Sequence, residues 1–499
     1  MAASLVVAVA VSFVVILISV HAFQLLSNAR RRLPPGPLPL PLVGNLLHIG
    51  RGCPHRTLAR LAERYGSLMS VRLGVVQAVV VSSADVASEI LHKHNAQVAD
   101  RPPWSTRGIA NGHQRQLHHR VSKPHARWRA LRRLCATELF APSRLNALQP
   151  LRQEKVRELV RHVSEKAALG EPVTVRDPAF TASMNMLSRT VFSKDLDSGP
   201  SVRGLKDLVK EGTVLVMTPN VSDFYPVVAA ADLQGLRRKL TPIVAHAYEM
   251  IDKQIEQRLR DRQAGEPRKD DMLDVVLDEW KKEGSLIDHN AMRGLFTDLF
   301  VAGADTSSTT VEWAMAELLQ NPQVMNKVKR ELREVLGTKT EVEESDISQL
   351  PYLQAMVKEV LRLHPPVAMT YYRAEATVEV QGYQIPQGTI IILNISAVHR
   401  NENTWDNPDK FEPERFMNKE REFSGKDCRL IPFGGGRRIC LGLPLANRTV
   451  HTILASLLHQ FEWNLPEEGR SNGVDMAEKY GVVVSLATPL KVIPQKCAS

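Results

Sequence analysis

The sequence predicts a mainly α-helical protein with smaller β regions, preceded by a single N-terminal transmembrane helix. Three observations predict this fold class. An uncharged apolar run comes first, a proline-rich stretch follows it, and the remaining chain shows long helical periodicity interrupted by two short strand-like patches. Of the 499 residues, 43% are hydrophobic and 24% are charged. This composition is typical of a globular protein, and the chain is long enough to bury a large core.

The first predicted element is a membrane anchor over residues 1–29. Residues 2–20, AASLVVAVAVSFVVILISV, carry no charge, and as a helix they span about 28 Å, close to the roughly 30 Å of a bilayer's hydrocarbon core. The alternative is a cleaved secretory signal, but Arg30, Arg31 and Arg32 follow the apolar run, whereas a signal peptide carries its positive charges before that run. By the positive-inside rule these arginines keep the following chain in the cytosol.

The second predicted element is a basic and proline-rich hinge over residues 30–45. Its prolines remove backbone donors and restrict φ, so we expect a stiff, extended spacer that sets the angle between anchor and body. These prolines are Pro34, Pro35, Pro37, Pro39 and Pro41. With no internal repeat and no second linker of this kind, residues 46–499 are predicted to form one large domain.

The cysteines indicate a reducing compartment. They are few, scattered and odd in number, which argues against a disulfide framework. The sequence contains no CxxC pair of the kind that would indicate a zinc site. They are Cys53, Cys135, Cys428, Cys440 and Cys497.

The body is predicted to contain strands within residues 68–81 and 378–393 and a helix over residues 443–461. The longest helical pattern, residues 289–320, is apolar on most sides and is therefore expected to cross the core. Asp298, Asp305 and Glu312 recur in it every seven residues and so share one stripe. Buried carboxylates are costly unless the protein uses them.

Within that helix, residues 302–307 read AGADTS. The glycine and the hydroxyls that can compete for backbone carbonyls predict a local kink or widening. The alternative is a helix that merely tolerates small polar residues, and the hexapeptide alone leaves both interpretations open.

Two further stretches have informative spacing. KEVLRLHPP places Glu359 and Arg362 on one helix face, and Arg415 of DKFEPERF can reach them if the chain folds back. Alone, such a pair is usually solvated. Residues 433–442, FGGGRRICLG, bring three glycines and two arginines to Cys440. Positive surroundings and backbone amides of this kind favour the thiolate form of a cysteine.

These motifs resemble those of the cytochrome P450 family. FGGGRRICLG matches the signature F-x-x-G-x-R-x-C-x-G at every fixed position, and WRALR (residues 128–132), AGADTS, EVLR and PERF match further landmarks in the same order. The resemblance covers the whole chain and implies the P450 fold. It also implies haem b (iron protoporphyrin IX) with Cys440 as the axial ligand of the iron and O2 as co-substrate. The thiolate supplies electron density that favours O–O cleavage.

The resemblance also implies roles for individual residues. Besides Cys440, the residues implied in haem binding, several of them at the propionates, are Phe433, Gly436, Arg438, Trp128, Arg132 and Arg373. Thr306 and Asp305 are expected beside dioxygen, where they relay protons to its outer oxygen. Glu359, Arg362 and Arg415 are expected to form a structural triad beneath the haem.

The resemblance extends to plant microsomal terpenoid hydroxylases, including geraniol and labdane-related diterpene hydroxylases of grasses, through FVAGADTSSTTVEWAMAELLQNP (residues 300–322). It implies an apolar substrate, a labdane-related diterpene olefin being favoured, in specialised or defence metabolism such as phytoalexin synthesis. The expected pocket residues are Phe296, Asp298, Leu299, Phe300, Ala302, Val367, Ala368 and Met369. Tyr371 and Tyr372 depart from the family, since relatives commonly have an aliphatic residue and a proline there.

The implied partners are membrane lipid of the endoplasmic reticulum and NADPH–cytochrome P450 reductase, a flavin protein that passes electrons from NADPH. The net charge is +10, and residues 113–133 are densely basic, unlike the apolar loop usual in relatives. Nucleic acid is an alternative partner, but no RNA- or DNA-binding module accompanies this basic segment, and steering of an acidic reductase is favoured.

Two alternatives to a monooxygenase remain open. One is a haem-thiolate isomerase or dehydratase, whose members usually lack the threonine found at Thr306, and the other is a non-catalytic haem-binding protein.

Overall fold

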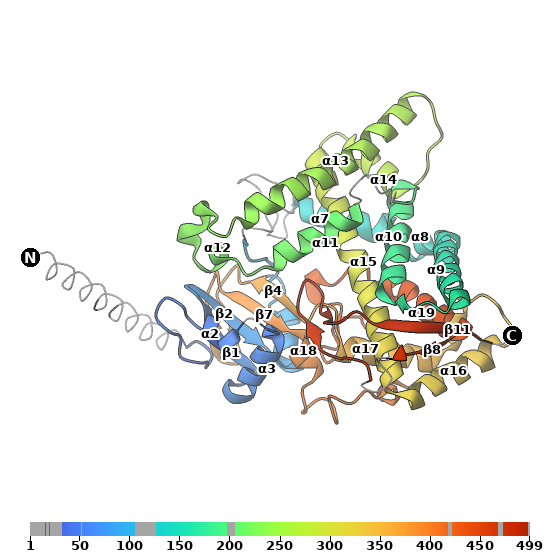
Figure 1. Ribbon diagram of the computed structural model, residues 1–499. Helices are drawn as coiled ribbons and strands as arrows, with labels where there is room; N and C mark the ends of the chain where they lie inside the picture. Colours follow the sequence, from blue (N-terminus) through green and yellow to red (C-terminus); the bar gives the residue numbers. More distant parts are fainter. Residues whose placement is uncertain are drawn as a thin grey trace, which may run out of the picture.

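The computed structural model describes residues 32–50, 52–104, 126–196, 205–417, 422–467 and 473–497, together with residues 15 and 19 (Figure 1). The anchor predicted over residues 1–29 therefore lies outside the described residues, apart from those two positions. Over the described ranges, no helix combines the length and the apolar character needed to cross a bilayer. The description covers nearly all of the predicted hinge and domain.

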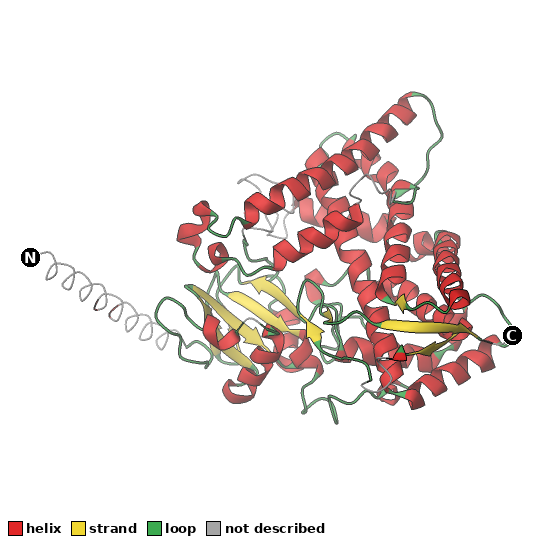
Figure 2. Ribbon diagram, viewed as in Figure 1, coloured by secondary structure: helices red, strands yellow, loops and turns green. Residues whose placement is uncertain are grey.

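Helices dominate, as predicted, and short strands gather in two places (Figure 2). The longer helices are α3 (Pro54–Tyr65), α7 (Ala126–Glu138), α9 (Gln149–Leu169), α10 (Arg176–Phe192), α11 (Leu205–Met217), α13 (Leu236–Gln263), α14 (Met272–Trp280), α15 (His289–Gln320), α16 (Pro322–Leu336), α17 (Pro351–Leu363) and α19 (Leu443–Gln460). The short ones are α2 (Leu46–Ile49), α4 (Ala84–Ser88), α8 (Pro142–Ala147), α12 (Val221–Phe224) and α18 (Ile395–His399). The 3₁₀ and π turns are η1 (Glu89–Lys93), η2 (Pro226–Ala231), η3 (Asp346–Gln349), η4 (Pro413–Phe416) and η5 (Gly436–Arg438).

Helix α15 occupies the bounds predicted from the sequence and runs through the middle of the molecule (Figure 1). It begins at Asp288, whose side chain accepts a hydrogen bond from the Ala291 amide and so satisfies a free donor of the first turn. Gly303 allows α10 to approach closely, because a Cβ there would lie 2.5 Å from a methyl carbon of Leu187. Helices α10, α13, α17 and α19 all pack against α15.

The larger sheet has the strand order β1-β2-β7-β4. Its strands are β1 (Leu68–Leu73), β2 (Val76–Val81), β7 (Ile390–Asn394) and β4 (Met369–Arg373). The patch at residues 68–81 is thus an antiparallel hairpin, as its alternating apolar pattern allows. The second patch divides, because β7 pairs in parallel with β2, while β5 (Val378–Val380) and β6 (Tyr383–Ile385) form a separate hairpin.

The smaller sheets complete the fold near the C-terminus. Strands β3 (Val173–Thr174), β11 (Lys491–Lys496) and β8 (Phe461–Asn464) form one sheet, and β9 (Glu478–Lys479) pairs with β10 (Ser485–Leu486). One large apolar core joins α9, α15, α16, α17 and α19, and a second lies among α10, α13, α14 and the first half of α15. The site described below lies beside both.

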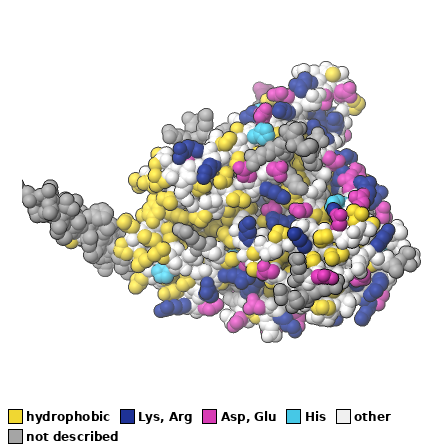
Figure 3. All heavy atoms as spheres, viewed as in Figure 1, with side chains coloured by type: hydrophobic (Ala, Val, Ile, Leu, Met, Phe, Trp, Pro, Cys, Tyr) yellow, Lys and Arg dark blue, Asp and Glu magenta, His cyan; other side chains and the backbone are white. Residues whose placement is uncertain are grey.

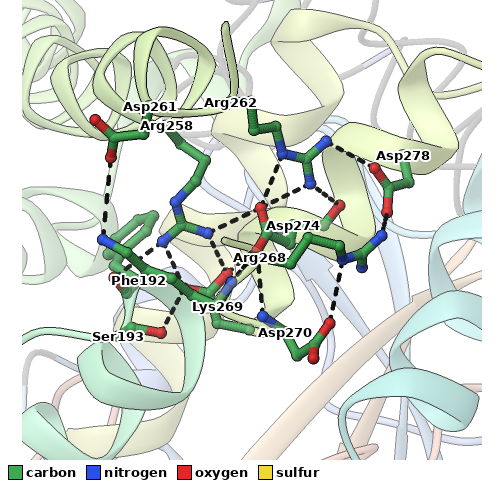
Figure 4. Close-up of polar contacts among 11 residues, drawn as sticks. Phe192, Ser193, Arg258, Asp261, Arg262, Arg268, Lys269, Asp270, Asp274 and Asp278 are labelled. Atoms are coloured by element: carbon green, nitrogen blue, oxygen red, sulfur yellow. Dashed lines mark hydrogen bonds and ion pairs between the residues drawn. The ribbon is translucent and has the colours of Figure 1, made fainter. Parts of the chain in front are cut away.

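A network of ion pairs ties the end of α13 to α14 (Figure 4). Arg258 contacts Asp271 at 2.7 Å and Asp274 at 3.0 Å, and Arg262 contacts Asp274 at 2.6 Å and Asp278 at 2.7 Å. Burial of Asp274 opposes its ionisation, but hydrogen bonds from Arg262, a backbone amide and Arg258 prevail and hold the pKa of Asp274 at about 2. The two helices are therefore fixed to each other at this end.

Candidate active site

A cavity of about 530 Å³ lies between α15 and the loop that carries Cys440. This is within the size range of small-molecule sites. Ten residues predicted from the sequence line it: Trp128, Arg132, Asp298, Leu299, Ala302, Thr306, Val367, Phe433, Arg438 and Cys440. Segments far apart in the chain therefore meet at one cavity.

The cysteine loop, residues 433–442, forms the proximal wall. Gly434 and Gly436 have φ angles of 71° and 62°, in the region that favours glycine. The loop closes on itself because the Cys440 amide donates to the Phe433 carbonyl at 2.9 Å. The side chain of Cys440 is exposed, but its exposure is to the cavity that it lines.

Several groups act on the Cys440 thiol. Burial raises its pKa, and this effect prevails over the amides of Gly442 and Leu443 and the guanidinium of Arg132, which all favour the thiolate. A cationic metal at the sulfur would reverse the balance, since a coordinating thiol loses its proton. The donor set at Cys440 therefore fits a thiolate ligand.

Cationic and aromatic groups line one edge of the cavity. The guanidinium carbons of Arg438 and Arg132 lie 4.5 Å and 5.5 Å from the centre of the Trp128 ring. Burial, and then the nearby Arg101, lower the pKa of Arg438 to about 10. Because an anion at this edge would relieve the cost of burying these charges, the edge fits the carboxylates of a haem.

Two residues predicted to bind haem lie elsewhere. Arg373 does not line the cavity; its guanidinium lies 3.9 Å from the carboxylate of Asp100. Gly436 lies behind the loop, where a Cβ would be 2.6 Å from the Leu91 carbonyl oxygen. Arg101, which sequence reasoning missed, instead lies over the ring of the cavity-lining Tyr372 at 4.8 Å.

The distal wall is one face of α15, where Leu295, Asp298, Leu299, Ala302 and Thr306 line the cavity. The Thr306 hydroxyl donates to the Ala302 carbonyl at 2.8 Å, and Ser307 and Thr310 bond in the same way to the carbonyls four residues earlier. This is the competition for carbonyls that the AGADTS motif predicted. Helix α15 nevertheless continues through it without a break.

The three acidic residues of α15 do not act as one stripe. Asp298 lines the cavity, Asp305 is paired with Arg176 of α10 at 2.5 Å, and buried Glu312 accepts a hydrogen bond from the Leu490 amide at 3.1 Å. A seven-residue repeat drifts by about 20° around a straight helix. Seven residues also advance about 10 Å along the helix axis, so each of the three carboxylates meets different neighbours. The carboxylate of Asp305 is outside the cavity lining, and its part in proton relay stays a prediction.

Four predicted pocket residues are core residues instead. Phe296 and Phe300 are fully buried and pack against Phe192, with ring centres 5.3 Å and 5.7 Å apart, because they share the face of α15 that turns toward α10. Ala368 and Met369 are buried at the start of β4, and Met369 packs among the apolar side chains of the larger sheet. Thr370 and Tyr372 of β4 line the cavity in their place.

The predicted triad does assemble. Glu359 and Arg362 form an ion pair at 2.7 Å with no exposed side-chain surface, and Arg415 reaches Glu359 at 3.2 Å. Arg362 also donates to the His399 carbonyl at 2.9 Å.

The ring of His399 then links the triad to the cysteine loop. Its Nε2 accepts a hydrogen bond from the Ile431 amide at 2.8 Å, two residues before Phe433. Burial, and then Arg362, lower the pKa of His399 to about 3, so the ring stays neutral and can accept this bond. Sequence reasoning missed His399.

Comparison with known proteins agrees with this geometry. A family model described as Cytochrome P450 matches residues 34–493. Geraniol 8-hydroxylase from Catharanthus roseus is 41% identical over 478 residues, which cover 95% of this chain and 96% of that protein. Ferruginol synthase from Isodon rubescens is 40% identical, over 94% and 96% of the two chains. Oryzalexin D synthase from Oryza sativa subsp. japonica is 42% identical, over 96% and 97%.

Proposed function

The chain belongs to the cytochrome P450 family and is a monooxygenase, and from this premise we propose that it hydroxylates an apolar terpenoid, with a labdane-related diterpene olefin as the favoured substrate. The observation that carries the proposal is the largely apolar cavity that Cys440 and Thr306 both line. Its walls include Leu131, Leu187 and Leu299, so a hydrocarbon substrate would be desolvated there. The relatives are named for geraniol, ferruginol and oryzalexin, all terpenoids.

Membership of the family implies haem iron and the use of O2. When bound, haem activates dioxygen so that one oxygen atom enters a C–H bond and the other leaves as water. In this chain Cys440 would hold the iron through its sulfur, and Arg438, Arg132 and Trp128 would hold the propionates. The triad of Glu359, Arg362 and Arg415 supports the loop through His399.

On the distal side, we assign Thr306 as the residue that holds a proton at its hydroxyl oxygen facing the cavity. Asp305 is paired with Arg176 of α10 outside the cavity. We therefore propose that it supplies protons from the side of α15 that faces α10. Asp298 is the one carboxylate of α15 that lines the cavity, where it is a polar exception on a largely apolar wall.

The proposed electron donor is NADPH, through a flavin reductase that docks by charge, and the proposed location is the endoplasmic reticulum membrane with the domain in the cytosol. The apolar surface supports a membrane contact. Figure 3 shows hydrophobic side chains gathered over the side that carries β1, β2 and α12. The exposed residues of these segments and their neighbours are Leu38, Leu40, Leu42, Leu47, Val75, Val227, Val228 and Leu233.

These segments are joined. The Val75 amide donates to the Phe224 carbonyl at 3.2 Å, and the Tyr225 hydroxyl donates to the Leu42 carbonyl at 3.2 Å. A continuous apolar surface of this kind marks an interaction site. A chain that begins at residue 30 should therefore still float with phosphatidylcholine vesicles, and its recovery only in the lipid-free fraction would contradict the membrane contact.

The function is tested by supplying microsomes that contain the protein and reductase with NADPH and a panel of monoterpene and diterpene olefins. We expect a product heavier by one oxygen atom, with NADPH consumed, and more of it from labdane-related diterpenes. Microsomes with Cys440→Ser should form none. A rearranged product without added oxygen, or no NADPH consumption with any terpenoid, would contradict the proposal.

A further inference from the structure

A π-helical segment braces the cysteine loop from outside the cavity. Element η1 is a π-helix, a conformation that is rare and often marks functional sites. It packs against η5, the 3₁₀ turn at Gly436–Arg438 that precedes Cys440. The chain then continues to Ala99, whose carbonyl accepts a hydrogen bond from Arg438 Nε at 2.8 Å.

The central contact is made by the side chain of Asn95. Its Oδ1 accepts a hydrogen bond from the backbone amide of Arg437 at 2.9 Å. The fit is tight, because a Cβ at Gly436 would lie 2.9 Å from the same Oδ1 and 2.6 Å from the Leu91 carbonyl oxygen. The turn before Cys440 is therefore clamped between a hydrogen bond and a steric wall.

His92 makes a second contact one turn earlier. Its Nε2 lies 2.9 Å from the Gly425 carbonyl oxygen, and its Nδ1 lies 3.2 Å from the Ser88 hydroxyl. Gly425 in turn lies against the loop, since a Cβ there would be 3.1 Å from the Gly434 carbonyl oxygen. The segment from Ser88 to Ala99 thus contacts the cysteine loop directly and through Gly425.

We propose that Asn95 is a positioning residue for the thiolate of Cys440, acting through the Arg437 amide. This inference rests on the proposed role of Cys440 as the haem ligand. The Gly436 carbonyl accepts from the Ile439 amide at 3.2 Å, so a rotation of the turn is passed directly to the residue before Cys440. The amides of Gly442 and Leu443 then no longer converge on the sulfur, and the loop no longer holds the sulfur of Cys440 in its position.

The test compares holoenzymes that carry Asn95→Leu and Asn95→Asp. Leucine has a similar size but no acceptor, whereas aspartate keeps an oxygen for the Arg437 amide. The readouts are the fraction of the ferrous carbon monoxide complex with the red-shifted Soret band and the midpoint potential of the haem. We expect Asn95→Leu to lose more than half of that band and to shift the potential to more positive values, and Asn95→Asp to keep the band.

Asn45→Leu is the matched control. The Asn45 Oδ1 also accepts a backbone hydrogen bond, from the Arg72 amide at 2.7 Å, but it lies in the hinge region. This variant should lower thermal stability without changing the band. If Asn95→Leu does not fold, Asn95→Ala takes its place in the comparison with Asn95→Asp.

Three outcomes would overturn the inference: an unchanged band in Asn95→Leu, equal loss in Asn95→Asp, or equal loss in Asn45→Leu. A wild-type protein without the red-shifted band would overturn the assignment of Cys440 as well. Failure of the inference alone is therefore distinguishable from failure of the proposed function.

Discussion

The two walls of the cavity are built in opposite ways. On the distal wall, the hydroxyls of Thr306 and Thr310 bond to carbonyls of α15 itself. On the proximal wall, side chains from other segments hold the chain before Cys440. Asn95 bonds to an amide more than three hundred residues later in the sequence, and His399 lies at the end of α18. A helix satisfies its own backbone, whereas a glycine-rich loop needs partners.

The difference indicates where function is sensitive to remote changes. A change at the distal wall should alter chemistry and leave the fold intact, because α15 needs no other segment to form its hydrogen bonds. A change in the supports of the proximal wall should alter stability and ligation together. The following tests proceed from the largest expected effect to the smallest.

Cys440→Ser should remove the defining group of the proximal wall. We expect complete loss of the red-shifted Soret band of the ferrous carbon monoxide complex, because serine does not replace thiolate donation. Cys135→Ser is the control, since Cys135 also lines the cavity but has its thiol pKa raised to about 12, mainly by burial. A band retained in Cys440→Ser, or lost equally in Cys135→Ser, would contradict the assignment.

Glu359→Gln should show that the proximal wall depends on a remote support. Removing one charge from this fully buried pair leaves Arg362 without compensation, which costs about 3–5 kcal/mol of unfolding free energy. Chemical denaturation measures this change. Glu412→Gln is the matched control, because Glu412 also pairs with Arg415, at 3.1 Å, but is partly exposed, and its loss should cost about 1 kcal/mol or less. Equal costs for the two variants would break the comparison.

Thr306→Ala should change chemistry without changing the fold. We expect an intact Soret band and nearly unchanged thermal stability, but several-fold less product per NADPH, because reduced dioxygen leaves as hydrogen peroxide when its proton source is lost. Product, NADPH and peroxide are measured with the same reductase. Ser308→Ala removes a hydroxyl that bonds to the Asp305 carbonyl at 3.2 Å and does not line the cavity, so its stoichiometry should match that of the wild type. An unchanged ratio in Thr306→Ala would remove the residue from the proposed mechanism.

Sequence reasoning predicted the parts of the site that are encoded locally. The bounds of α15 follow from its apolar pattern, and the cysteine loop follows from its spaced glycines, arginines and Cys440. Glu359 and Arg362 share a helix face by spacing alone. Each of these depends on neighbours within a few residues along the chain.

The residues that were misplaced or missed depend on tertiary contacts. Phe296 is apolar and one turn from the cavity-lining Leu299, but only the position of α10 decides that it faces Phe192. Asp305 is turned away by Arg176, which no local spacing connects to it. Asn95 carries no signal in its own segment, because its partner is a backbone amide more than three hundred residues later.

The ion-pair network at the end of α13 fixes that end of the helix, and the remaining length packs against α11 and α15. Its 28 residues make a rod of about 42 Å, pinned to α14 through Arg258 and Arg262. The opposite end lies near α12 and η2, beside the exposed Val227 (Figure 1). A tilt of about 5° about the pinned end would carry the far end through about 4 Å, given the rise per residue of a helix. Such a tilt would turn a small rotation beside Asp271 into a displacement about the width of a methyl group at the apolar surface.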